Sequence, residues 1–167
     1  MRLATERLII RSTEDGDAAG LHRIYSDPEA MKYIPGGAFD DTERVRRSIA
    51  RSQEREARSG MTLWAVADKE TGEFVGQCGV VPVDGKGPEI ELAYHFARAF
   101  WGRGYATEAA RAVAEYAFRE LKLKRLLGLT FPANVPSQRV LEKAGFTYVR
   151  DAEWYGMTMR EYVRERG

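Results

Sequence analysis

The sequence predicts a mixed α/β domain that spans residues 1–167 and is built on a mostly antiparallel sheet. Two observations lead to this fold class. Three runs with the alternating pattern of strands follow one another with short turns between them, at 62–67, 74–83 and 89–96. A helical segment at 106–121 then separates the last of these runs from an apolar run at 125–131, and a strand–helix–strand unit of this length favours a parallel crossover.

The elements before this meander have weaker patterns. Residues 3–11 contain a short apolar run that is typical of a strand. Aspartates precede an apolar-periodic segment at 15–25, which predicts a capped helix that ends before Pro28. From 41 to 59 both charges are dense, so we expect a solvent-exposed helix with a thin buried seam. Its arginines are interleaved with glutamates, which favours a salt-bridged face over a nucleic-acid surface.

The second half of the chain contains a long helix, a short helix and a hairpin. The helix at 106–121 is rich in alanine and apolar at helical spacing, so one of its faces packs on the sheet. After the strand at 125–131, Asn134 is a natural N-cap for a short helix that Gly145 ends. Two final runs predict a closing hairpin, at 146–150 and 157–164. The predicted order is β-α-α-β-β-β-α-β-α-β-β, a sheet of about six to seven strands with flanking helices.

The composition narrows the classes of function. The formal net charge is +1, which gives no support for binding nucleic acid or an anionic membrane. No apolar run reaches the roughly 18 residues of a membrane span, and no signal-peptide core follows the first residues. The one cysteine, Cys78, excludes an internal disulfide and a thiolate metal cluster, and its apolar neighbours predict a core residue. We therefore expect a soluble, cytoplasmic protein without a metal site.

Two glycines, Gly102 and Gly104, stand between the strand at 89–96 and the helix at 106–121. A turn at this place leaves free N–H groups at the positive end of a helix dipole, which is a site for a phosphate group. The alternative is that the glycines supply only positive φ angles and close packing. No Lys-Ser/Thr pair and no third glycine follow, so the two common nucleotide-binding loops are excluded. The loop could hold a pyrophosphate by its backbone alone.

The segments Trp101–Ala109 and Asn134–Phe146, in this order, resemble motifs of the GNAT acyl-CoA N-acyltransferases. More narrowly, they resemble the Rim-type branch, which acetylates N-termini of ribosomal proteins, and the opening Thr5–Arg11 is also typical of that branch. The family's loop is usually written Q/R-x-x-G-x-G/A; Gly104 and Ala106 match it, and a tryptophan takes the first position. The resemblance covers nearly the whole chain and implies a GNAT-like fold with the parallel crossover at the acyl-CoA site. Similar proteins are commonly dimers, so a homodimer is implied as well.

The resemblance also implies acetyl-CoA as the cosubstrate. Main-chain amides beside Trp101 would hold its pyrophosphate, namely those of Gly102, Arg103, Gly104, Tyr105, Ala106 and Thr107. The strand end at Tyr94, His95 and Phe96 would pair with the pantetheine amides, and Asn134 would hydrogen-bond to the same arm. Such a site suits a long flexible anion, because a strand edge and a helix end recognise it without side-chain charges.

The chemistry of amide formation limits the acceptor. It needs a neutral amine, an oxyanion donor and a proton for the leaving thiolate. An α-amine with a pKa near 8 is appreciably neutral at pH 7.4, whereas a lysine amine must lose its proton at a cost of roughly 4 kcal/mol. A modest base therefore suits an N-terminal α-amine. A backbone N–H near Tyr94 or His95 is the expected oxyanion donor.

Three carboxylates compete for the role of general base. Glu91 comes first, acting through water, because it lies on the strand that would carry the thioester; Glu89 is on the same face and stays open. Glu153 is the rival that the resemblance implies, since Rim-type enzymes have an acidic residue shortly after the Gly-Phe. For the acid, many GNAT enzymes use a tyrosine where this chain has Leu141, and Rim-type enzymes use a serine at the position of Ser137.

These features predict an acetyl-CoA-dependent N-acetyltransferase that acts on a primary amine, such as a protein N-terminus. A small-molecule amine (a polyamine, an antibiotic or an amino acid) is the alternative acceptor, and a non-catalytic acyl-CoA-binding regulatory module is the alternative class. The acceptor is expected between the helices of 15–59 and the closing hairpin. His22 and His95 have no partner visible in the sequence and are interpreted as structural.

Overall fold

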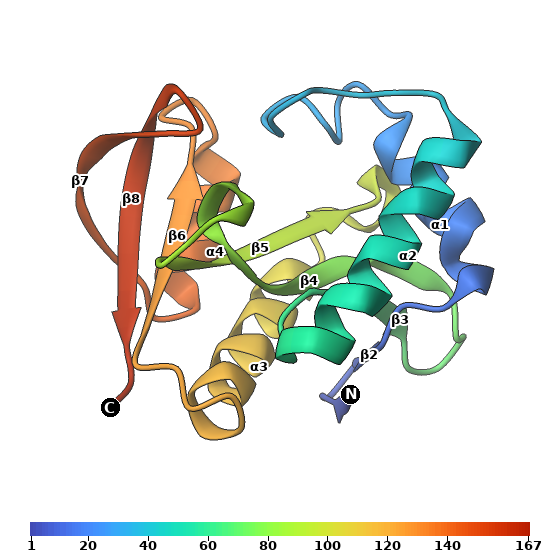
Figure 1. The fold of residues 1–167 in the computed structure, drawn as a ribbon, viewed down its shortest axis with the longest axis horizontal. Coiled ribbons are helices and arrows are strands. Elements are labelled where there is room, and N and C mark those ends of the chain that lie inside the picture. The colour runs from blue at the N-terminus through green and yellow to red at the C-terminus, as the bar shows by residue number, and fades with distance from the viewer.

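The computed structural model describes residues 1–167 and has at its centre one sheet of eight strands, in the order β1-β2-β3-β4-β5-β6-β8-β7 (Figure 1). The strands are β1 (Arg2–Ala4), β2 (Leu8–Arg11), β3 (Leu63–Asp68), β4 (Phe74–Pro82), β5 (Ile90–Phe96), β6 (Arg125–Thr130), β7 (Thr147–Trp154) and β8 (Met157–Glu165). Neighbouring strands are antiparallel throughout, except that β5 and β6 are parallel.

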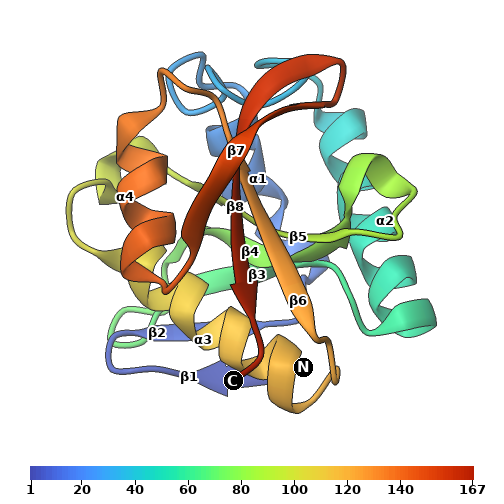
Figure 2. The same ribbon diagram turned by 90° about the vertical axis from the view of Figure 1, so that its left-hand side faces the viewer.

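Four α-helices flank this sheet (Figure 2). They are α1 (Ala18–Tyr25), α2 (Thr42–Ser59), α3 (Tyr105–Arg119) and α4 (Val135–Lys143). Three short 3-10 helices lie in the connections: η1 (Asp15–Asp17), η2 (Val83–Gly85) and η3 (Arg98–Phe100). None of the helices is both long enough and apolar enough to span a membrane.

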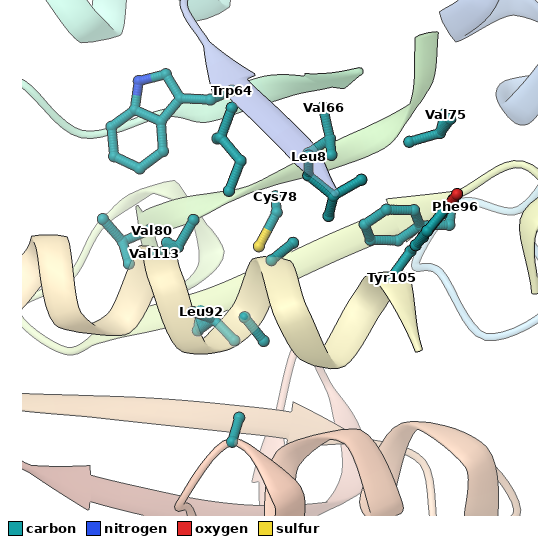
Figure 3. Packing of buried hydrophobic residues seen from close by; sticks show 14 of the residues in the cluster. Leu8, Trp64, Val66, Val75, Cys78, Val80, Leu92, Phe96, Tyr105 and Val113 are labelled. Carbon is teal, nitrogen blue, oxygen red and sulfur yellow. The ribbon is translucent and has the colours of Figure 1, made fainter. Parts of the chain in front are cut away.

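Different helices pack on the two faces of the sheet, α3 on one and α1 on the other. Cys78 and Val80 of β4 and Leu92 of β5 point to the face covered by α3, where they meet Val113 (Figure 3). Cys78 is fully buried there, as predicted. Burying side chains of this kind contributes about 1.5–3 kcal/mol each. On the opposite face, α1 packs against β4 through a hydrogen bond from Gln77 to the hydroxyl of Tyr25.

Alanines let α3 lie close to the sheet. Four of them have no exposed surface at all, at positions 109, 110, 114 and 117. Because an alanine side chain is a single methyl group, a helix face made of alanines brings the helix backbone near the strands it covers. The amphipathic spacing in the sequence therefore predicted both the helix and the face that it buries.

The predicted fold class is confirmed, including the parallel crossover from β5 through α3 to β6. The sheet has one strand more than the predicted order, because residues 3–11 form a hairpin of β1 and β2 rather than one strand, with Leu3 opposite Ile10. Its turn is fixed by the Thr5 hydroxyl, which accepts a hydrogen bond from the Leu8 amide at 3.0 Å. The closing hairpin is also confirmed, and its first strand continues to Trp154.

The parallel pair is the feature that places the site. The register of β5 with β6 contains one pair of residues, Glu91 with Leu127, and past this point the two strands diverge (Figure 1). The edge of β5 that faces β6 is therefore without a strand partner from Leu92 to Phe96, while its other edge pairs with β4 along its whole length. Backbone groups on such an edge are available to an extended ligand that carries amides.

Candidate active site

The glycine loop joins the unpaired end of β5 to the start of α3. Gly102 and Gly104 have φ angles of 74° and 78°, in the left-handed region that favours glycine. Gly104 is the N-cap of α3, and no side chain caps the helix there. The first N–H groups of α3 are therefore free of side-chain acceptors at the positive end of the helix dipole. This geometry fits a diphosphate that is held by main-chain amides.

Trp101, at the start of the loop, makes a hydrogen bond to the last residue of β5. The indole N–H of Trp101 donates to the carbonyl oxygen of Phe96 at 2.9 Å. Trp101 as a whole is 48% exposed. Because the Phe96 carbonyl is occupied in this way, the backbone groups of Tyr94 are the ones that β5 can offer to an extended partner. The prediction that His95 shares this role is wrong, because alternate residues face opposite edges and the backbone groups of His95 face β4.

Hydrogen bonds from the β1–β2 hairpin hold the glycine loop and the start of α3. These bonds, from Thr5 and Arg7 to Glu108 and from Arg7 to Arg103, are called the clamp. Glu108, in the first turn of α3, accepts hydrogen bonds from the Thr5 hydroxyl at 2.6 Å and from the backbone N–H of Arg7 at 2.8 Å. The Arg7 side chain donates from Nε to Glu108 at 2.7 Å and from Nη1 to the carbonyl oxygen of Arg103 at 2.7 Å. Burial would raise the pKa of Glu108, but these hydrogen bonds outweigh it and lower the pKa.

A serine and a tyrosine meet where α4 begins. Asn134 caps α4 by accepting from the Ser137 amide at 3.3 Å, as predicted for an N-cap. The hydroxyls of Ser137 and Tyr94 are 2.8 Å apart, and the Tyr94 hydroxyl also donates to the Ser137 carbonyl oxygen at 3.1 Å. Burial raises the pKa of Tyr94, so its hydroxyl stays protonated. The sequence assigned only backbone contacts to Tyr94 and gave no sign of this pairing.

His95 of β5 belongs to a hydrogen-bonding network on the face of the sheet that α1 covers. His95 Nδ1 lies 2.6 Å from the amide nitrogen of Gln77, which also donates to the Tyr25 hydroxyl at 2.7 Å. Burial lowers the pKa of His95 to about 4, so the ring is neutral at pH 7. The other histidine, His22, contacts Asp40 at 2.6 Å. Both histidines thus have partners that only the fold brings to them.

Glu91 is a buried carboxylate at the point where β5 and β6 part. It is 7% exposed, and one oxygen accepts a hydrogen bond from the hydroxyl of Tyr155, in the turn between β7 and β8. Burial raises the pKa of Glu91 from 4.5 to about 7, the Tyr155 hydrogen bond lowers it, and the charge of Asp84 raises it. A carboxyl with this pKa exchanges its proton near neutral pH, which is a property of general bases.

The two alternative carboxylates lie in different surroundings. Glu89 is half-buried and precedes the first residue of β5. Glu153 is exposed on β7, opposite Thr158 of β8. Neither donates to or accepts from another side chain, whereas Glu91 is bound by a hydroxyl inside the protein. No group of three or more His, Cys, Asp or Glu side chains is arranged to hold a metal ion.

Comparison with known proteins agrees with these features. The acetyltransferase (GNAT) domain family matches residues 7–147. The chain is 38% identical over 166 residues to the uncharacterized protein YkkB of Bacillus subtilis (strain 168), covering 98% of this chain and 95% of that protein. An acetyltransferase from Agrobacterium tumefaciens str. C58 has a similar crystal structure, with a TM-score of 0.85, 28% identity and coverage of 99% of this chain and 95% of that chain.

A Rim-type enzyme shares the fold. The structure of RimL, a ribosomal L7/L12 alpha-N-protein acetyltransferase in complex with coenzyme A, superimposes with a TM-score of 0.80 over 99% of this chain and 98% of that chain, at 16% identity. The family uses acetyl-CoA as its acyl donor. The free amides of the glycine loop and the unpaired edge of β5 fit that donor. The chain therefore belongs to the GNAT family of N-acetyltransferases.

Proposed function

We propose that the protein transfers the acetyl group of acetyl-CoA to a primary amine, and that a peptide N-terminal α-amine is the preferred acceptor. The observation that carries this proposal is Glu91, a buried carboxylate with a pKa of about 7 beside the unpaired edge of β5. Moving a proton from an α-ammonium with a pKa near 8 to such a base costs roughly 1 kcal/mol, whereas the same step from a lysine ammonium costs roughly 5 kcal/mol. The site is therefore better matched to an α-amine.

Main-chain groups would hold the donor. The amides from Gly102 to Thr107 belong to the glycine loop and the first turn of α3, where they support the binding of a diphosphate. The edge of β5 at Tyr94 supports pairing with the amides of a pantetheine arm, and Asn134 has an NH₂ group that its capping role leaves free. When bound, acetyl-CoA supplies an activated thioester carbonyl. The backbone N–H of Tyr94 would stabilise negative charge on that carbonyl oxygen.

The remaining roles fall to two side chains. Glu91 would accept the proton of the amine, directly or through a water molecule. Ser137 would give a proton to the leaving thiolate, and the hydroxyl of Tyr94, 2.8 Å from Ser137 Oγ, would hold the serine side chain in place. The acceptor would approach between the loop that joins α1 to α2 and the tip of the β7–β8 hairpin, which lie on the same side of the molecule (Figures 1 and 2).

The proposal is tested by measuring thiol release from acetyl-CoA with matched peptides. One peptide carries a free α-amine and no lysine; its control is N-terminally acetylated and carries one lysine. We expect kcat/KM at pH 7.5 to be at least tenfold higher for the free α-amine, because the proton transfer is easier. Polyamines, aminoglycosides and free amino acids complete the panel. Turnover confined to the lysine peptide or to these small amines would reject the α-amine acceptor, and binding without turnover of any amine would reject the enzyme.

The Ser137→Ala variant tests the acid. We expect kcat to fall about tenfold to a hundredfold, because proton transfer to the leaving group is lost, while the Kd of coenzyme A stays within about twofold of wild type. Steady-state kinetics and calorimetry measure the two quantities. Ser52→Ala, a serine in α2, is the control for loss of a hydroxyl. Unchanged turnover in Ser137→Ala would remove Ser137 from the mechanism.

A further inference from the structure

We propose that Tyr155, at the tip of the β7–β8 hairpin, is a positioning residue that holds Glu91 through its hydroxyl, an inference that rests on Glu91 being the base of the proposed reaction. Tyr155 belongs to no motif in the sequence. It lies between the two predicted strands of the closing hairpin, 64 residues from Glu91 along the chain. Its role follows from three features of the turn.

The first feature is the fixed position of the hydroxyl. The Tyr155 hydroxyl donates to Glu91 Oε1. Asp84, in η2 between β4 and β5, lies near enough for its charge to act on both Glu91 and Tyr155. The hydroxyl joins the tip of the hairpin to β5. A phenol has a single proton to donate, and here that proton is directed at the carboxylate.

The second feature is the backbone on which the tyrosine stands. Tyr155 has a φ of 56° and Gly156 a φ of 70°, and Trp154 pairs with Met157 on either side of them. A two-residue hairpin turn with two positive φ angles favours Asn or Asp at its first position, and a tyrosine there is strained. The strain therefore lies on the residue whose side chain holds Glu91, and strain at a specific contact of this kind points to a functional constraint.

The third feature is a pair of hydrogen bonds from β7 to Glu161 of β8 that supports the turn. Glu161 of β8 is 2% exposed and accepts a hydrogen bond from the indole N–H of Trp154 at 3.0 Å. It also accepts one from Arg150 at 3.3 Å. These bonds tie the last residue of β7 to the neighbouring strand. The turn residue that follows is thereby presented from a rigid hairpin rather than from a mobile loop.

The surroundings of Glu91 give the tyrosine its effect. The residues opposite Glu91 in the neighbouring strands are apolar, Val81 of β4 and Leu127 of β6. Burial and the Asp84 carboxylate both raise the pKa of Glu91, and the Tyr155 hydroxyl lowers it. Tyr155 is thus the group that favours the ionised carboxylate, which is the form that can accept a proton. Without it, Glu91 would be protonated over a wider range of pH.

The experiment compares Tyr155→Phe and Tyr155→Asn with wild type. Phe keeps the ring and removes the hydroxyl; Asn removes the phenol and suits the turn. Tyr155→Phe, which keeps the ring over Glu91, is expected to raise the Glu91 pKa by about one unit, which moves the acid limb of the kcat/KM profile to higher pH by the same amount. The Glu91 carboxyl is followed directly by NMR in ¹³C-glutamate-labelled protein, with its resonance assigned from its loss in Glu91→Gln. Thermal unfolding of Tyr155→Asn is expected at or above the wild-type temperature.

The matched control is Tyr148→Phe, which removes an exposed tyrosine hydroxyl from the same hairpin, bonded to Asp151 at 3.1 Å. It should leave both the NMR titration and the pH profile unchanged. A wild-type Glu91 titration in Tyr155→Phe, or an equal shift in Tyr148→Phe, would overturn the inference. Full activity of Glu91→Gln would instead overturn the base assignment, and since the NMR titration needs no substrate, the two failures are distinguishable.

Discussion

Replacing Glu91 with Gln is expected to slow the enzyme and stabilise the protein at the same time. The loss of a general base should lower kcat by about a hundredfold at pH 7.5. The gain in stability follows from the raised pKa of about 7, because the folded protein binds the Glu91 proton more tightly than the unfolded chain does. Between about pH 4.5 and 7 the unfolded chain gives up that proton first, so the free energy of unfolding falls as the pH rises.

Glutamine has no such proton to lose. At pH 8 the Glu91→Gln variant should therefore exceed wild type in free energy of unfolding by up to roughly 3 kcal/mol, and the difference should vanish near pH 4.5. Urea unfolding at a series of pH values and steady-state kinetics measure both effects. Glu89→Gln and Glu153→Gln are the matched controls, since these carboxylates have no hydrogen bond inside the protein. A loss of stability at pH 8, or equal kinetic losses in either control, would contradict the assignment.

Replacing Gly104 with Val is expected to weaken coenzyme A binding by about tenfold to a hundredfold. The φ of 78° at this position is strained for a β-branched residue by about 1–3 kcal/mol. A Cβ atom built at Gly104 would also lie 3.3 Å from Nη2 of Arg7, so the clamp would have to move. Both effects displace the amides at the start of α3, which are the groups that we expect to hold the diphosphate.

Calorimetry with coenzyme A measures this change. The control is Gly72→Val, in the turn between β3 and β4, which also has a positive φ, 75°, and open space around it. It imposes a similar backbone strain away from the glycine loop. The two variants should lose similar stability in thermal unfolding, and only Gly104→Val should lose affinity. Unchanged affinity in Gly104→Val would show that the loop does not bind the diphosphate.

The fold could be predicted in most of its elements because their patterns are local. The alternation in β3, β4 and β5 and the helical spacing of α3 arise from which face each residue buries. The split of residues 3–11 into β1 and β2 was missed, because Thr5 and Arg7 are not typical turn residues. Their turn is held by Glu108, a contact that no local pattern records.

The candidate site was predictable where one segment forms it and not where several do. The glycines of the loop were recognised by their spacing, Glu91 was named from its place on a strand, and Ser137 was named from the resemblance to Rim-type enzymes. The partner of each was not: Tyr94 reaches Ser137 from another element, and Tyr155 reaches Glu91 from the far end of the chain. Pairings of this kind depend on tertiary packing, which period and propensity do not encode.

The clamp of Arg7 on Glu108 has a consequence for how the protein assembles. These residues are 101 positions apart, so their contact closes most of the chain into one loop, at an entropic cost that other contacts must offset. Before this contact forms, the glycine loop at the start of α3 lacks the hydrogen bonds from Arg7 to the Glu108 carboxylate and to the Arg103 carbonyl. A nucleotide that binds more tightly to the loop held in this way must also stabilise the docked N-terminal hairpin. The hairpin in turn favours nucleotide binding by the same free energy. Binding of the coenzyme and docking of the first ten residues are therefore thermodynamically coupled.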